Sequence, residues 1–289
     1  MKSKNNYFNA LEFRKIIEVA DVNPFLAKEL YERYLDKYPK DYTSYSYYAG
    51  ILITLGELDK AEEVLNKLNI LISKEENVLE RYNRLKKIKE NISFVTLKYL
   101  IYKNDYNSAL DYCDSNPYVF SINVVPIKLY LKSKLGLLES CDRDDCNYLK
   151  RQLIEYQEED FLEHIKNHQA DYNIDIDDPN DNIFVPEFDT DKIISEVKKY
   201  IPSNKKLFSG FFEDTYYFKY DECGRINNRL YNYFKVVCFH DTDKFITMYV
   251  FPNGDNFPYI DLNYLKEKED SKIKKISQID KFYKRYGKM

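Results

Sequence analysis

Apolar positions recur three and four residues apart in the first part of the chain, and alternate with polar positions near its end. The first pattern is clear over residues 8–68 and predicts amphipathic helices. The segments TYYFKY, YFKVVCFH and FITMYVF are rich in β-branched and aromatic residues, and turn-forming DECGRINN and DTDK separate them. The sequence therefore predicts an α+β multidomain chain, with N-terminal all-α helical hairpins followed by a small α+β domain with an antiparallel sheet.

Two helical units repeat with a period of 34 residues. Ala27 and Ala61 are 34 residues apart, each where two paired helices need a small side chain. Pro39 is predicted to end one helix, and the Asp41 carboxylate to cap the next. Gly56 is predicted to form the tight turn inside the second unit, because glycine tolerates a left-handed backbone.

This pattern resembles the tetratricopeptide repeat (TPR). The matching positions are Tyr45, Tyr48, Ala49, Leu52, Gly56, Ala61, Leu65 and Leu68, with Tyr45 in place of the usual tryptophan. A weaker match in KNDYNSALDYCDSNP uses Asn104, Tyr106, Ala109 and Pro117. The two matches together predict about two and a half to three repeats, which is about what stacked repeats need to bury a continuous core. The resemblance implies that the repeats bind a protein or peptide partner.

The same patterns divide the chain. We expect a TPR-like helical repeat domain over residues 1–150 and an α+β domain over residues 151–289. The second is expected to contain an acidic loop at about 171–191 and a basic C-terminal tail at about 264–289. Between the two repeat matches, ENVLERYNRLKKIKENI is expected to form a solvated helix.

Composition restricts the classes of function. The 44 basic and 48 acidic residues give a net charge of -4, so any nucleic-acid site must be local. The odd number of cysteines and the absence of a CxxC pair favour reduced thiols at Cys113, Cys141, Cys146, Cys223 and Cys238. No apolar run reaches the roughly 20 residues of a membrane span, and MKSKNNYFNA lacks a signal-peptide core. We therefore expect a cytoplasmic protein with no membrane partner.

The chain has three histidines, His164, His168 and His240. In EEDFLEHIKNHQ the first two are four residues apart, on one helix face, where they can face a metal or a phosphate. A zinc site is disfavoured because Ile165 replaces the glutamate of HExxH and no third ligand is evident. Calcium is also disfavoured, because an EF-hand glycine and terminal glutamate are missing around Asp175, Asp177, Asp178 and Asp181.

A second candidate site lies on a predicted hairpin. A three-residue loop at 241–243 pairs His240 with Lys244, Val237 with Thr247, and Lys235 with Tyr249. Alternation puts Lys235, Thr247 and Tyr249 on one face, where a cation, a hydroxyl and a phenol can bind a phosphate. The alternative is an outer sheet surface that is merely solvated. The opposite face, expected to be buried, carries Phe234, Val236, Cys238, Ile246, Met248 and Val250.

From about residue 160 to 260, the order of elements resembles phage and mobile-element nucleases of the barnase/EndoU/colicin/RelE-like (BECR) group. The shared features are an HI..(R/K/N)H helix, a KVV strand and a final IITMYP-like strand. They appear here as His164, Ile165 and His168, then Lys235, Val236 and Val237, then Ile246, Thr247, Met248 and Tyr249. One departure is that Val250 and Phe251 precede Pro252, where the family proline follows the tyrosine directly.

The resemblance implies a metal-independent endoribonuclease of toxin or phage-defence type, which uses no cofactor and leaves a cyclic phosphate. His164 or His168 would be the base or acid, Lys235 or Arg225 would stabilise the phosphorane, and Thr247 and Tyr249 would position the phosphate. Arg225 and Arg229, near aromatic residues, are candidates for gripping a phosphate and stacking a base.

Three other interpretations stay open. The first is a noncatalytic adaptor, because repeat proteins more often bind than catalyse. The second is a metal-dependent hydrolase that uses His164, His168 and the acidic loop. The third is nucleophilic chemistry at Cys223, for which a small turn residue is the simpler role.

Overall fold

The computed structural model describes residues 9–81, 85–119, 124–138, 158–166, 182–185, 187–227, 229–252, 254–268, 270–272 and 274. Its contacts divide the chain into two compact units. The helical unit comprises residues 1–160, 207–215 and 237–246, and the sheet unit comprises residues 161–206, 216–236 and 247–289. The boundary predicted at residue 150 lies outside the described residues.

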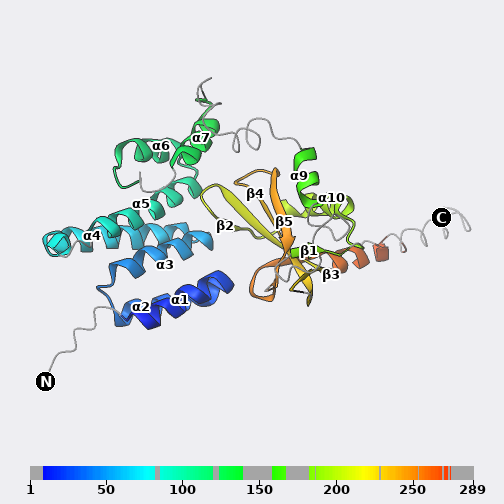
Figure 1. The fold of residues 1–289 in the computed structure, drawn as a ribbon, viewed down its shortest axis with the longest axis horizontal. Coiled ribbons are helices and arrows are strands. Elements are labelled where there is room, and N and C mark those ends of the chain that lie inside the picture. Colours follow the sequence, from blue (N-terminus) through cyan, green and yellow to red (C-terminus); the bar gives the residue numbers. More distant parts are fainter. Residues whose placement is uncertain are drawn as a thin grey trace, which may run out of the picture. The chain divides into compact units, whose positions relative to one another are not determined.

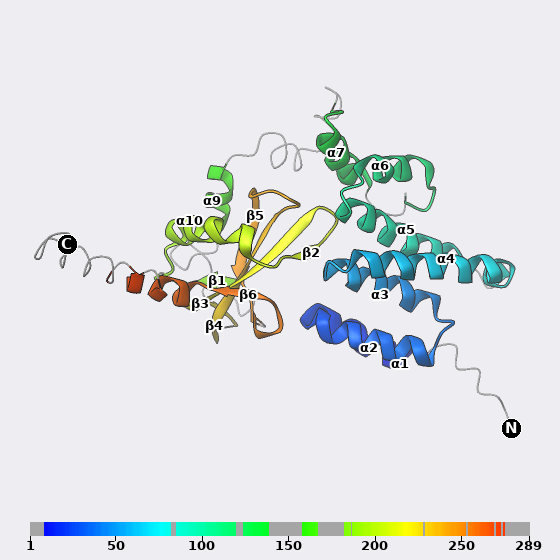
Figure 2. The ribbon, with the colours of Figure 1, turned by 180° about the vertical axis from the view of Figure 1, so that it is seen from behind.

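Helices that follow one another along the helical unit pack side by side (Figures 1 and 2). They are α1 (Ala10–Val22), α2 (Pro24–Lys37), α3 (Tyr42–Thr54), α4 (Leu58–Arg81), α5 (Leu85–Tyr102), α6 (Tyr106–Ser115) and α7 (Val124–Leu135). None of the helices within the described ranges is long and apolar enough to cross a membrane.

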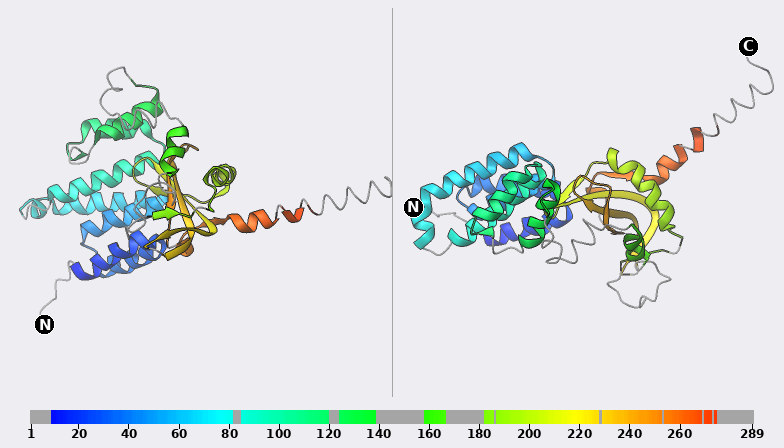
Figure 3. Two further views of the ribbon diagram at one scale, coloured as in Figure 1. Left: turned by 45° about the vertical axis from the view of Figure 1, so that its right-hand side comes forward. Right: turned by 90° about the horizontal axis from the view of Figure 1, so that it is seen from above.

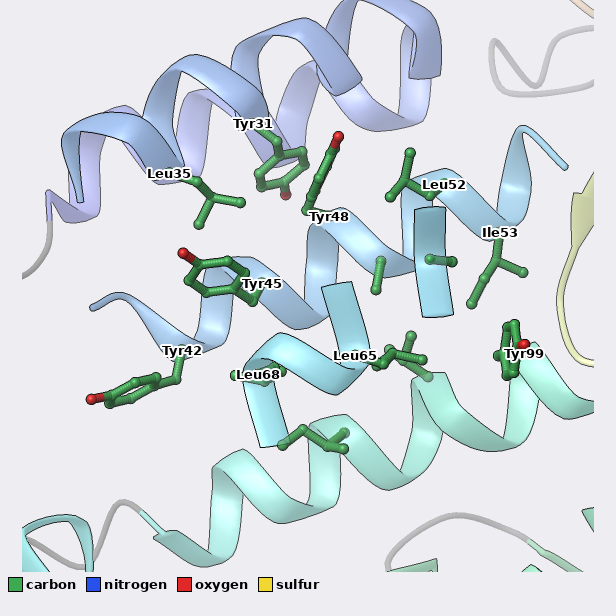
Figure 4. Packing of buried hydrophobic residues seen from close by; sticks show 14 of the residues in the cluster. Tyr31, Leu35, Tyr42, Tyr45, Tyr48, Leu52, Ile53, Leu65, Leu68 and Tyr99 are labelled. Carbon is green, nitrogen blue, oxygen red and sulfur yellow. The ribbon is translucent and has the colours of Figure 1, made fainter. Parts of the chain in front are cut away.

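The apolar stripes predicted from the sequence form one core in this unit. Tyr31, Leu52 and Leu68 are fully buried and come from three different helices (Figure 4). Ala27 and Ala61, the two alanines of the 34-residue period, also have no exposed surface, as close helix approach requires.

Three helices end in the same left-handed cap. After α3, Gly56 adopts φ 76°, and its N–H donates to Ile53 O at 2.9 Å. The next N–H reaches the carbonyl five residues before it, at 2.8 Å. Asn104 after α5 and Gly136 after α7 adopt φ 61° and 70° and close the same two bonds. The turn predicted at Gly56 is therefore confirmed.

The start of α3 differs from the prediction. Asp41 occupies the N-cap position, but its carboxylate accepts no hydrogen bond from a backbone amide of α3. It accepts instead from the Ser44 hydroxyl at 2.5 Å and from the Tyr34 hydroxyl at 2.9 Å. Because Asp41 is buried, these two donors satisfy a carboxylate that would otherwise be costly to desolvate.

The predicted solvated helix between the repeat matches is also corrected. α4 runs to Arg81 and α5 begins at Leu85, so the segment contributes to two helices. Ile88 and Ile92, four residues apart on α5, are buried in the core. Their spacing is an amphipathic stripe that the many charged residues around it obscured.

The sheet has the order β1-β3-β4-β5, and β2 and β6 also pair with β3. Its strands are β1 (Asn182–Phe184), β2 (Leu207–Ser209), β3 (Glu213–Ile226), β4 (Arg229–Phe239), β5 (Phe245–Val250) and β6 (Tyr259–Asp261). β1 and β2 are antiparallel to β3, whereas β6 is parallel to it. The predicted α+β class is confirmed, and the β3–β6 pair adds a parallel ladder that the sequence pattern did not indicate.

Two predicted loops contain strands. β3 continues to Ile226 through most of DECGRINN, and the turn falls at Asn227, whose φ is 51°. The acidic loop predicted at about 171–191 contains β1 and the first residues of α10 (Thr190–Tyr200), which Asp189 caps by accepting from the Lys192 N–H at 3.1 Å. Residues 171–181 lie outside the described part of the chain.

Stacked and edge-on rings form the core of the sheet unit. Phe234 of β4 lies 5.4 Å from Phe218 of β3 and 5.4 Å from Phe188, measured between ring centroids. Phe188 stacks on Phe184 of β1 at 4.6 Å. These rings, together with buried Ile194 of α10, account for one apolar face of the sheet.

Hairpin ends contribute to the core of the helical unit. Phe208 of β2 stacks on Tyr102 of α5 at 4.4 Å. The Tyr102 hydroxyl donates to Glu213 O at 2.5 Å, which holds the start of β3. Phe212 stacks on Tyr130 of α7 at 5.1 Å. Aromatic residues far apart in the sequence thus fix these strand ends to α5 and α7.

Candidate functional site

A histidine and a threonine meet in the sheet unit. His164 lies on α9 (Glu158–Lys166), where the neighbouring Phe161 and Ile165 are buried and His164 is exposed. Its Nε2 is 3.2 Å from Oγ1 of Thr247 on β5. The buried pair, four residues apart, fixes α9 so that the histidine beside it faces the strand.

A lysine lies beside this pair on the adjacent strand. Lys235 Nζ of β4 is 4.4 Å from the ring centroid of Tyr249 on β5 and 5.4 Å from that of Phe251. The Phe251 N–H donates to Tyr233 O at 2.7 Å, and this bond places Lys235 opposite Tyr249, as predicted. The two rings hold the ammonium by cation–π attraction at the polar face of the sheet.

Alternation separates this polar face from the core. Lys235, Thr247 and Tyr249 are half-buried, whereas Phe234 and Met248 are at most 1% exposed. The predicted buried face is confirmed apart from Ile246, which is half-buried. His164 on α9 and Phe188 before α10 contact opposite faces of the strands, and the two helices are seen on either side of the sheet in the right-hand view of Figure 3.

The two predicted arginines do not join this group. Arg225 and Arg229 are exposed and flank the turn at Asn227 between β3 and β4. Lys235 is six residues beyond Arg229 on β4, which at the usual rise of a strand is about 20 Å. Arg229 therefore does not contact a phosphate held by Lys235. His168 lies outside the described residues.

The arrangement has the parts of an acid–base site. The His164 imidazole contacts the Thr247 hydroxyl, and the Lys235 ammonium, held over an aromatic ring, lies on the next strand. Such groups can transfer a proton and stabilise a developing negative charge on phosphate oxygens. Period-two alternation predicted the three strand residues. It gave no sign of Phe251, which lies one residue beyond β5.

The loop between β4 and β5 departs from the predicted pairing. The Phe239 N–H, and not that of His240, is bonded across the loop, donating to Lys244 O at 3.0 Å. The His240 N–H donates to Phe212 O at 2.8 Å. Asp241 adopts φ 54°, which turns the chain one residue earlier than a regular ladder allows. His240 therefore lies outside the β4–β5 ladder. It belongs to the helical unit together with the rest of residues 237–246.

Two of the described cysteines, Cys113 and Cys223, are poor nucleophiles. Cys223 lies in β3 rather than in a turn, is fully buried, and donates from Sγ to Tyr231 O at 3.3 Å. Burial raises the pKa of its thiol to about 12, and that of the Cys113 thiol to about 11. Both thiols are therefore protonated at neutral pH, which disfavours nucleophilic chemistry. Cys141 and Cys146 lie outside the described residues.

No family model, curated protein or solved structure matches the chain. The TPR and BECR resemblances therefore stay predictions from the residues alone.

Proposed function

We propose that the sheet unit is a metal-independent endoribonuclease of toxin or phage-defence type. The observation that carries the proposal is the 3.2 Å contact between His164 Nε2 and Thr247 Oγ1, with the Lys235 ammonium over the ring of Tyr249, two residues further along β5. These residues come from α9, β5 and β4, so the fold brings together groups that are up to 83 positions apart in sequence.

In the proposed reaction, the ribose 2′-oxygen attacks the adjacent phosphorus. The P–O2′ bond forms and the P–O5′ bond breaks, leaving a 2′,3′-cyclic phosphate and a 5′-hydroxyl. His164 accepts the proton of the 2′-hydroxyl or supplies the proton of the 5′-oxygen, since imidazole exchanges protons near neutral pH. A second acid or base completes the transfer. His168, four residues further along, is the sequence candidate for it.

The strand residues act on the phosphate. Lys235 stabilises the extra negative charge of the phosphorane, and the Thr247 hydroxyl donates to a phosphate oxygen or orients His164. Tyr249 and Phe251 restrict the position of the Lys235 ammonium, so the lysine side chain loses little conformational entropy when the phosphate binds. Their rings also offer faces on which a base can stack.

The test is cleavage of labelled RNA by purified full-length protein. His164→Gln should lower kcat by about 10²–10⁴-fold, the usual loss when acid–base catalysis is removed. Thr247→Val should lower kcat by about 10²–10³-fold, the usual loss of one hydrogen-bond donor to the developing charge. Lys235→Met should cost about 10²–10³-fold through lost charge stabilisation. The matched controls are Glu163→Gln on α9 and Lys266→Met, both exposed. Equal cleavage by Thr247→Val and the native chain would contradict the site.

The alternative function is that of a noncatalytic adaptor. It is favoured by the repeated left-handed cap, since Gly56 and Asn104 close identical hydrogen bonds before α4 and α6. Ala61 and Ala109 then follow five residues later with no exposed surface. Helix pairs built alike can stack to present a binding groove. In that case native protein cleaves no RNA, and His164→Gln leaves partner binding unchanged.

A further inference from the structure

A buried histidine in the helical unit is surrounded by oxygen atoms. His240 is 1% exposed, and its Nδ1 lies 2.8 Å from Asp214 Oδ1. Its Nε2 lies 3.1 Å from Asn104 Oδ1 and 3.3 Å from Asp241 Oδ2. The residues come from three places in the chain: the cap after α5, the start of β3 and the loop before β5. None of them belongs to the nuclease site proposed above.

The oxygens around Nε2 suit a positively charged species at that position. If Nδ1 carries the hydrogen and donates it to Asp214, the Nε2 lone pair faces two acceptors, which is repulsive without a proton or a metal ion. The Tyr106 hydroxyl donates to the Asn104 oxygen at 2.7 Å, and the second lone pair of that oxygen is available to Nε2.

The distances around Nε2 fit a shared metal ion. Ligands about 2.1 Å from one metal are separated by about 3.0–3.4 Å, and Nε2 lies within this range of each of the two oxygens. One divalent ion would also offset the negative charge of the Asp214 and Asp241 carboxylates. Lys134 Nζ, 3.1 Å from the His240 carbonyl oxygen, is the other charged group bonded to this residue.

We propose that His240 Nε2, Asp241 Oδ2 and Asn104 Oδ1 bind a divalent transition-metal ion, with Asp214 orienting the imidazole. A carboxylate on the second nitrogen of a metal-binding histidine fixes its tautomer and raises its basicity. The Tyr102 and Phe208 rings, with centroids 4.7 and 5.7 Å from that of the imidazole, hold its plane. Asp241 and Asn104 are exposed, which gives the ion a path from solvent and leaves positions for water. The imidazole ligand favours zinc, cobalt or nickel over magnesium or calcium.

The test is calorimetric titration of chelator-treated full-length protein with Zn²⁺, and Co²⁺ absorption as a probe of ligand geometry. One ion per chain is expected to bind, and neither Mg²⁺ nor Ca²⁺. Asp241→Gly and Asn104→Gly should each weaken binding at least tenfold. Glycine keeps the left-handed backbone at both positions, so loss of affinity would not reflect a strained backbone. Asp214→Asn should weaken binding by about 10–100-fold.

Two controls make the result specific. Asp243→Ala removes an exposed carboxylate from the same loop and should bind as the native chain does. His164→Ala should also bind normally, since α9 is not part of this cluster. Failure of both Zn²⁺ and Co²⁺ to bind, or binding lost in His164→Ala and kept in Asp241→Gly, would overturn the proposal. Because the readout is binding, neither result depends on whether the chain cleaves RNA.

Discussion

Lys98 of α5 shows how burial alters a single residue. Its Nζ lies 3.2 Å from Thr54 Oγ1 and 5.8 Å from the ring centroid of Tyr102. Desolvation lowers the pKa of Lys98 to about 8, and the Glu213 carboxylate only partly opposes this shift. The charged ammonium is therefore less favourable in the folded chain than in the unfolded one.

This shift predicts a pH-dependent effect of Lys98→Met on stability. Below about pH 8 the Lys98 amine is charged in both the folded and the unfolded state, so the whole cost of burying the charge lowers the free energy of unfolding. From about pH 8 to 10.5 the folded state loses the proton first, so stability rises with pH relative to the variant. Denaturant unfolding should show the largest advantage of Lys98→Met at pH 7 and a smaller one at pH 10. The exposed Lys15→Met is the control. An advantage that is the same at both pH values would contradict the assignment.

At the candidate nuclease site, some residues could be placed from the local sequence pattern and others only from the tertiary structure. Lys235, Thr247 and Tyr249 could be placed on one face from the sequence, because side chains alternate strictly along paired strands. The contact between His164 and Thr247 joins α9 to β5 across 83 positions, and no local pattern encodes it. The predicted pairing of His240 with Lys244 was wrong because Asp241 adopts a left-handed backbone. The sequence does not reveal this, since the same loop residues are also compatible with other backbone conformations.

Among the elements, α3 offers a matched pair of glycines. Gly50 lies inside the helix, and nothing lies within 4 Å of the position of an added Cβ. Gly56 lies in the cap with φ 76°, where an added Cβ would make only an ordinary contact with Phe208 at 3.9 Å. Space therefore permits both substitutions, and only the backbone conformation distinguishes them.

Opposite effects on stability are expected from the two substitutions. Gly50→Ala should raise the free energy of unfolding by about 0.5–1 kcal/mol, because alanine loses less conformational entropy in a helix. Gly56→Ala should lower it by about 1–2 kcal/mol, the cost of a left-handed non-glycine residue. Thermal denaturation of the two variants and the native chain measures both. Similar changes in Tm for the two variants would mean that the cap does not require the left-handed backbone.

The helices were predictable where charge did not mask their apolar stripe. Gly56 and the alanines at 27 and 61 marked turns and close approaches that the structure contains. The stripe with Ile88 and Ile92 was obscured, because lysines and glutamates fill the positions around it. Asp41 had the sequence of a helix cap, yet the Tyr34 hydroxyl competes for its carboxylate. Tertiary partners of this kind cannot be read from neighbouring residues.

For the whole molecule, the units do not follow the order of the chain. The sequence suggested helices first and a sheet afterwards, and the α+β class follows from that order. Residues 207–215 and 237–246 nevertheless belong to the helical unit, where Phe208 and Phe212 stack on Tyr102 and Tyr130. Composition gave no sign of this, since aromatic residues are abundant throughout, with 29 tyrosines and 18 phenylalanines.

The nuclease proposal is tested most directly by the products of RNA cleavage. Full-length protein is incubated with 5′-labelled RNA in EDTA, with folding checked by circular dichroism in the same buffer, and the new 3′ ends are identified. Fragments ending in 2′,3′-cyclic phosphate, formed by the native chain and lost in His164→Gln and Thr247→Val, are the predicted result. No cleavage over a broad panel of RNAs, or cleavage that Thr247→Val leaves unchanged, would contradict it.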